Sequence, residues 1–154
     1  MIRQDTRAIE GLPLRLLTVS LLLSLTVPLA MDSLQGLERE AERRLLEENA
    51  NRLRVAGSEV FIAGPGNVRT IVLRWDQDRG GGYLVISHDP ESARSRKIEV
   101  FQGALQVDEL LVVDPDYPLI GREGDLQIGQ SARAVRLSCE LVGQGPCVVV
   151  EVIA

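Results

Sequence analysis

The chain has 154 residues, which is enough for one domain and an appendage but not for two full domains. Hydrophobic residues make up 45% of it and aromatic residues only 3%, so a core must be built from aliphatic side chains. The formal net charge of −5 argues against a general nucleic-acid binder, which would present a basic face.

The first predicted element is a membrane-spanning helix over residues 12–31. Residues 16–31 carry no charge and would span ~24 Å as a helix, slightly less than the ~30 Å hydrocarbon core. Leu12 and its neighbours lengthen the run, and Arg15 is close enough to its end to reach the lipid headgroups. We therefore expect a retained single-pass anchor in a cell membrane.

Charge sets the expected orientation of this helix. The residues before it are basic: Arg3, Arg7 and Arg15. Acidic residues are the first charges after it, so the leader, residues 1–11, is expected in the cytoplasm and the rest of the chain outside. A cleaved secretory signal is an alternative, although Leu29 stands where a small residue is expected. A buried helix of a soluble protein is a third, and it would need a polar face that the run lacks.

An amphipathic extension is predicted to follow over residues 32–56. No proline interrupts this stretch, and Gly36 is the only helix breaker before residue 55. Apolar residues recur at three-to-four-residue spacing, at Leu34, Leu37, Ala41, Leu45, Leu46, Ala50 and Leu53. We expect one nearly continuous helix from about Leu12 to about Val55 that packs its second half against its own globular domain.

Residues 57–154 are predicted to form a β-rich domain outside the cytoplasm. Short β-branched segments alternate with Gly, Pro and Asp. Seven strands are expected, at residues 68–75, 83–87, 97–101, 110–113, 125–128, 132–141 and 147–153. Their hairpin-like spacing favours an antiparallel sheet or a small sandwich, and the last strand is expected to be central. The predicted fold class is α+β.

Two cysteines flank a turn-forming stretch, residues 142–146. If the flanking segments pair as a hairpin, Cys139 and Cys147 could come within bridging range. A disulfide there would contribute ~2 kcal/mol in an oxidising compartment. Two small buried thiols are the alternative.

The sequence predicts neither an enzyme nor a metal or cofactor site. His88 is the only histidine, and its setting at a strand end is typical of a surface turn. The glycine clusters fit hairpin turns and match no phosphate-binding motif. Asp114, Asp116 and Asp125 offer oxygen ligands, but their spacing differs from that of an EF-hand. N-glycosylation sequons are also lacking.

The leader, apolar helix, amphipathic continuation and β-rich head together resemble the type IV pilin-like architecture, particularly archaeal pilins with a class III signal peptide. The likeness covers about residues 1–55. It is carried by Arg7-Ala8 followed by Ile9-Glu10, by the apolar run, and by Pro28 as a helix-bending proline. The resemblance implies that a prepilin peptidase cuts between Ala8 and Ile9.

The resemblance also implies a structural role. The processed helix would begin at Ile9 and bundle with other copies or with other pilin-like subunits in an extracellular filament, as a pilin or a minor pseudopilin. Glu10 of one subunit could neutralise Arg15 of a neighbour, or both residues could lie at the headgroups. The alternative function is a single-pass, membrane-anchored binding or accessory domain that forms no filament.

Overall fold

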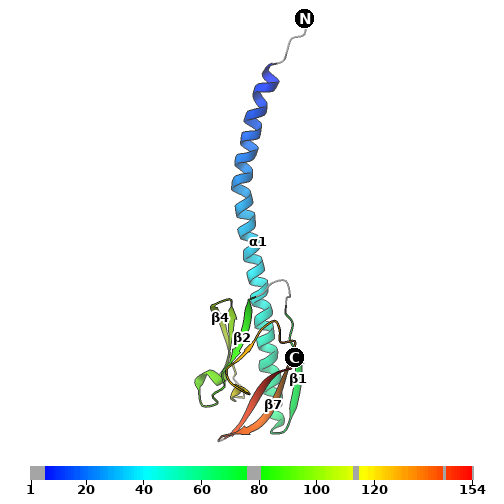
Figure 1. The fold of residues 1–154 in the computed structure, drawn as a ribbon, viewed down its shortest axis with the longest axis vertical. Helices are drawn as coiled ribbons and strands as arrows, with labels where there is room; N and C mark the ends of the chain where they lie inside the picture. The colour runs from blue at the N-terminus through cyan, green and yellow to red at the C-terminus, as the bar shows by residue number, and fades with distance from the viewer. Residues whose placement is uncertain (1–5, 76–80, 113–114, 144, 154) are drawn as a thin grey trace. The chain divides into compact units, whose positions relative to one another are not determined.

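The structure is a computed structural model that describes residues 6–75, 81–112, 115–143 and 145–153, with side chains from Leu14 onward. The chain divides into two units, Met1–Glu40 and Ala41–Ala154; the second is called the head here. The described elements are, in order (Figure 1), α1 (Thr6–Ala63), β1 (Val68–Val72), β2 (Gly82–Ile86), the 3-10 helix η1 (Ala93–Arg96), β3 (Lys97–Gln102), β4 (Leu105–Leu111), β5 (Leu119–Gly121), β6 (Leu126–Ile128), β7 (Ala134–Val142) and β8 (Gly145–Ile153).

Helix α1 is longer than the apolar pattern predicts at both ends. It begins at Thr6 and continues to Ala63, several residues beyond the expected end near residue 55. Gly57 lies within the helix, and the ring of Tyr117 occupies the place where a side chain would stand: a Cβ there would be 2.4 Å from the phenolic oxygen. The helix stops at Gly64, whose φ of +87° suits the left-handed residue that ends many helices.

The strands form two four-stranded sheets, with orders β1-β7-β8-β5 and β4-β3-β2-β6. The α+β class is confirmed, and β8 lies between two strands as predicted. One pairing departs from the antiparallel arrangement, because β5 runs parallel to β8. β4 begins at Leu105, earlier than predicted, and contains a bulge in which Val107 has no partner opposite on β3.

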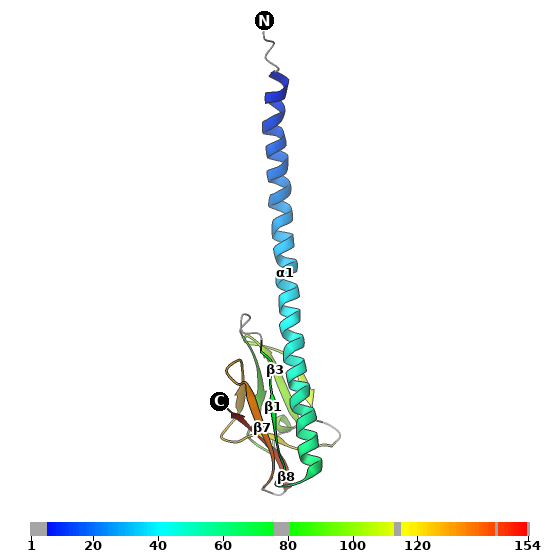
Figure 2. The same cartoon turned by 90° about the vertical axis from the view of Figure 1, so that its right-hand side faces the viewer.

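One hydrophobic core joins both sheets to one side of α1. Figures 1 and 2 show the strands gathered along the last turns of the helix. The helix contributes Leu46, Ala50, Leu53, Ala56 and Val60, and the sheets contribute mainly valine, leucine and isoleucine. The predicted packing of the amphipathic half is therefore confirmed. The buried face starts later than expected, however, because Leu34 and Leu37 are exposed.

Candidate membrane and assembly segment

The apolar first half of α1 is the candidate functional segment. Every residue from Leu14 to Glu40 is exposed, and the large apolar side chains from Leu14 to Leu37 are between 49% and 70% exposed. The helix is long and apolar enough to cross a membrane. Burying one leucine is worth about 1.5–3 kcal/mol, so water is a poor solvent for this run. Its surface fits packing with lipid or with other subunits.

Three hydroxyl groups within this segment are satisfied by the helix itself. Thr18 donates to the carbonyl oxygen of Leu14 at 2.8 Å, and Thr26 donates to that of Leu22 at 2.9 Å. Ser24 bonds the carbonyl oxygen of Leu21 at 2.8 Å in the same way. Hydroxyls that are satisfied locally do not have to find partners in lipid, where an unpaired polar group is costly. These three polar residues are thus compatible with an apolar environment.

The structure describes the N-terminal site residues only in part. Ala8, Ile9 and Glu10 have helical backbone, but their side chains lie outside the described residues. Arg15 is described and is exposed. Cleavage between Ala8 and Ile9 and the charge pair between Glu10 and Arg15 therefore stay predictions.

The predicted disulfide is wrong, because Cys139 and Cys147 are both free and buried. They do lie on the two strands of the β7–β8 hairpin, but Cys139 is opposite Val148 and Cys147 is opposite Glu140. Neighbouring positions on a strand point to opposite faces, so the two thiols are separated by the sheet. Cys139 packs in the main core, whereas Cys147 packs with Ile120 on the other face.

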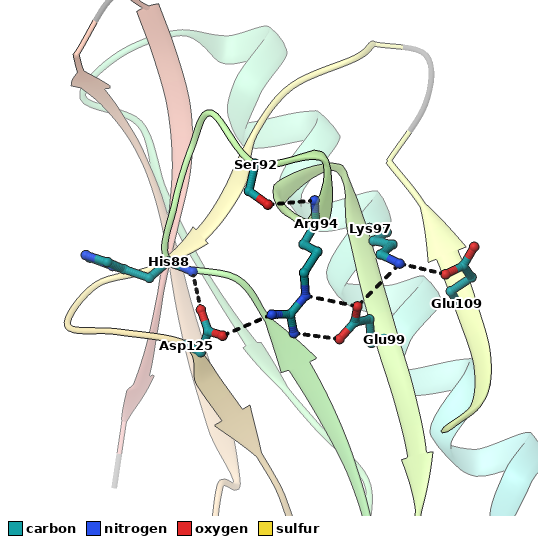
Figure 3. Close-up of polar contacts among 7 residues, drawn as sticks. All are labelled: His88, Ser92, Arg94, Lys97, Glu99, Glu109 and Asp125. Atoms are coloured by element: carbon teal, nitrogen blue, oxygen red, sulfur yellow. Dashed lines mark hydrogen bonds and ion pairs between the residues drawn. The ribbon is translucent and has the colours of Figure 1, made fainter. Parts of the chain in front are cut away.

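The head carries a charge network that sequence reasoning missed (Figure 3). Its centre is Glu99 on β3, a carboxylate in a residue only 8% exposed. Arg94 donates to its two oxygens from Nε at 3.2 Å and Nη2 at 2.9 Å, and the Nζ of Lys97 lies 3.3 Å away. These hydrogen bonds, that from Arg94 above all, lower the pKa of Glu99. Burial opposes them without reversing the shift.

The same network ties several segments of the head together. Arg94 also reaches Asp125 at 3.4 Å, and Asp125 accepts the backbone N–H of His88 at 2.8 Å. Lys97 on β3 bonds Glu109 on β4 at 2.8 Å. Each charge faces an opposite charge of the same chain, so the arrangement reads as a structural clamp.

The acidic residues considered as metal ligands have cationic partners instead. Asp125 faces Arg94, and Asp116 lies 3.0 Å from Arg96; Asp114 is outside the described residues. In the described part of the chain, no group of three or more His, Cys, Asp or Glu is placed to hold a metal ion. His88 is exposed, with Nδ1 2.8 Å from the carbonyl oxygen of Gly121.

A cavity of about 320 Å³ lies beside the β7–β8 hairpin, and Cys147 contributes to its lining. Burial raises the pKa of this thiol to about 11. Because the thiolate is the reactive form of cysteine, Cys147 is held in an unreactive state at neutral pH. The cavity therefore offers no activated nucleophile from this residue.

Two further residues that sequence reasoning missed fix the helix in the head. Asn49 is fully buried; its Nδ2 donates to the carbonyl oxygen of Arg74 at 2.6 Å, and its Oδ1 accepts the Arg74 N–H at 3.1 Å. Tyr117 donates its hydroxyl to the carbonyl oxygen of Arg54 at 3.0 Å. The sequence does carry a signal for the contact between Asn49 and Arg74, because the polar Asn49 stands between the apolar Leu46 and Ala50 of the predicted helix.

A long N-terminal apolar helix whose later turns pack on β-sheets is a pilin-like architecture. No family model, no curated protein and no solved structure matches the chain. The architecture and the exposed apolar surface thus carry the functional inference.

Proposed function

We propose that this protein is a structural, pilin-like subunit, a pilin or a minor pseudopilin, that assembles through the apolar half of α1. The observation that carries the proposal is the exposed run of aliphatic side chains from Leu14 to Leu37 on a helix whose later turns belong to a folded head. Before assembly the run lies in the membrane with the head outside the cytoplasm. In the assembly the same run packs against other subunits. The proposed role is not catalytic.

Processing follows from the same role. A prepilin peptidase would cut between Ala8 and Ile9, which leaves Ile9 as the first residue of the mature helix. N-terminal sequencing of the native protein tests this step. A start at Ile9 supports it, and an intact Met1 contradicts processing. A start near Met31 or Asp32 would mean that the apolar segment is removed and would overturn the proposed function.

Assembly is tested by the size of the native species. Gentle detergent extraction followed by sedimentation is expected to recover high-mass species rather than monomers. In Glu10→Arg, loss of the pairing with Arg15 of a neighbour should shift the protein to smaller species. Glu38→Arg, outside the apolar run, is the matched charge reversal and should leave the size distribution unchanged. Assembly that is equally unaffected by both variants would rule out the Glu10–Arg15 pairing.

Arg15 favours a second candidate function, a membrane-anchored binding or accessory domain that stays monomeric. An exposed arginine near the end of an apolar helix suits the headgroup region, whereas the core of a helical bundle requires a counter-charge for it. A protein that is monomeric in mild detergent and keeps Met1 would favour this role.

A further inference from the structure

The head has two long strand edges, one in each sheet. β1 ends the first sheet and β4 ends the second, on opposite sides of the head (Figure 1). We propose that β1 of one copy pairs with β4 of the next, so that neighbouring heads are joined by an antiparallel strand ladder. This inference rests on the proposed function, in which neighbouring copies have their helices pointing in the same direction.

The other two terminal strands are less suited to such pairing. β5 is tied to the second sheet, because the N–H of Gly121 donates to the carbonyl oxygen of Ser87 at 3.0 Å. β6 has only three residues, whereas β1 has five and β4 seven. An exposed edge of this length presents unpaired backbone donors and acceptors to another chain.

The backbone of β1 presents its outer hydrogen-bonding groups in an alternating pattern. Cys139 donates to the carbonyl oxygen of Asn67, and Leu73 donates to that of Arg133, both at 3.0 Å. Residues 67 and 73 therefore turn their backbone groups toward β7. By the alternation of an antiparallel ladder, residues 68, 70 and 72 turn theirs away from it. Those three residues are available to a partner strand.

The direction of each edge selects the partner. β1 runs back along α1, from Asn67, which bonds the Ala63 carbonyl oxygen, to Arg74, which is bonded by Asn49. β3 also ends near the start of the head's helix, because Gln102 bonds Glu42 at 2.6 Å. β4 is antiparallel to β3 and so runs with α1.

Two copies with the same orientation therefore bring β1 and β4 together in opposite senses, as an antiparallel ladder requires. Pairing of β1 with β1 would be antiparallel only if one head were inverted, which copies anchored in one membrane do not allow. The contact is heterologous, so it repeats from copy to copy and suits a ring or a filament.

The side chains of the two edges are complementary. Residues 68–75 contain Arg69 and Arg74 and no acidic residue, whereas 105–111 contain Asp108 and Glu109 and no basic residue. Both edges carry apolar side chains that are more than half exposed, namely Val68, Val72, Leu105 and Leu111. Opposite charges and apolar pairs across strands stabilise a ladder.

A groove beside β1 offers room for the incoming strand. Its volume is about 470 Å³, and it is lined by α1 around Arg52 and Val55 and by β1 from Arg69 to Val72. Side chains on the helix-facing side of a neighbouring β4, Asp108 among them, would enter it. Arg52 pairs with Glu48 on α1, and Arg69 on β1 pairs with Glu59 on α1, so an added carboxylate would join existing ion pairs.

Cysteine cross-linking in the full-length, membrane-embedded protein tests the contact. We expect the double variant Thr70→Cys with Glu109→Cys to give a ladder of disulfide-linked dimers, trimers and larger species on mild oxidation. Each single variant should lack the ladder, because the contact joins different strands. Thr70→Cys with Glu123→Cys, a residue on the β5–β6 turn, is the control pair. The native thiols are only 1% exposed and so do not compete.

A second variant tests the backbone hydrogen bonds between β1 and β4. Thr70→Pro is combined with Val72→Cys and Glu109→Cys and compared with that cysteine pair alone. The proline removes only an outward N–H, which an edge strand tolerates. The yield of disulfide-linked oligomers should fall at least tenfold, while the midpoint of thermal unfolding stays unchanged. Leu111→Lys should have the same two effects from the β4 side. Leu22→Cys reports helix packing independently. A disulfide-linked dimer through position 22 without a ladder through the edges overturns the strand pairing alone, whereas no cross-link at either place overturns the proposed function as well.

Discussion

The carboxylate of Glu99 illustrates how a single buried charge depends on its partners. Its contacts with Arg94 and Lys97 lower its folded pKa, whereas the unfolded value is about 4.3. The stabilisation is complete above the unfolded pKa and is lost as the pH falls through the folded pKa. Hydrogen bonds to a charged group contribute about 1.5–3 kcal/mol, and the half-exposed Arg94 favours the lower end.

We therefore predict that Glu99→Gln lowers the free energy of unfolding by about 1–2 kcal/mol at pH 7. The difference between variant and wild type should shrink as the pH falls below the unfolded value of about 4.3 and through the lowered folded pKa of Glu99. Urea unfolding of the detergent-solubilised chain, followed by the fluorescence of Trp75, measures both quantities. Glu109→Gln removes a more exposed carboxylate and should have a smaller effect; an equal effect would show that burial of Glu99 is unimportant.

The two cysteines permit a chemical prediction. Because their thiols are unbridged and buried, we expect a thiol reagent to label neither in the folded protein and both after denaturation without reductant. Burial raises the pKa of each thiol, which slows labelling further. Protein purified from an oxidising compartment should give the same number of labelled thiols in each state. Failure to label after denaturation would show a bridge and would contradict the β7–β8 register.

That register explains why sequence reasoning misjudged the bridge. The turn-forming stretch correctly indicated a hairpin between the cysteines. In the observed hairpin each pair joins an odd-numbered residue to an even-numbered one, as in Glu140 opposite Cys147. Cys139 and Cys147 are both odd-numbered, so they are never partners. A shift of one residue in the turn decides the face of every side chain, and turn composition alone does not fix it.

At the scale of elements, Asn49 fastens α1 to the chain just after β1. We predict that Asn49→Asp lowers the free energy of unfolding by about 2–3 kcal/mol, because a carboxylate oxygen replaces the donor that faces the Arg74 carbonyl oxygen at 2.6 Å. Asn51→Asp, two residues further on an exposed side of the helix, is the matched control and should change stability by less than about 0.5 kcal/mol. Similar losses in both variants would contradict the importance of the Asn49–Arg74 hydrogen bonds.

Gly57 offers a second test at this scale. In an exposed helix Gly→Ala stabilises by about 1 kcal/mol, but here the added methyl group would meet the hydroxyl of Tyr117. We predict that Gly57→Ala destabilises the head by about 1–3 kcal/mol. Adding Tyr117→Phe, which removes the clashing oxygen, should recover part of that loss. Gly36→Ala meets nothing within 4 Å and should not destabilise; a neutral Gly57→Ala would refute the close packing.

The elements themselves were only partly predictable. Strands with continuous β-branched residues, such as β8, stood out because burial on both faces leaves an apolar run. The first half of β4 did not, because Gln106, Asp108 and Glu109 are tolerated on a free edge. β5 was missed because three residues are too few to show a period. The end of α1 was placed too early because glycine and proline become frequent beyond Ala56, whereas the helix continues to Ala63.

For the whole molecule, the change from an all-round apolar helix to an amphipathic one was visible in the sequence. It predicted both the exposed segment and the packing of the later turns. The identity of the first buried helix residue was less accessible: Leu34 and Leu37 continue the three-to-four spacing but are exposed. Local spacing shows that a helix has an apolar face, whereas the extent of its cover depends on how far the sheets reach along it.

All residues of the main core lie at or after Leu46, and the apolar segment contributes none of them. We therefore predict that a chain begun at Ser33 is soluble without detergent and folds as the head alone, with an unfolding midpoint close to that of the full-length protein. The reason is that removal of residues 1–32 takes away surface that needs lipid or sister subunits but no contact within the core. Circular dichroism and sedimentation of the shortened chain measure folding and size, and a chain begun at Asn51 is the control, because loss of Leu46 and Asn49 should leave it unfolded. If the Ser33 chain were instead unfolded, the apolar half of α1 would be part of the fold itself and its exposure could no longer be explained by membrane or subunit packing alone.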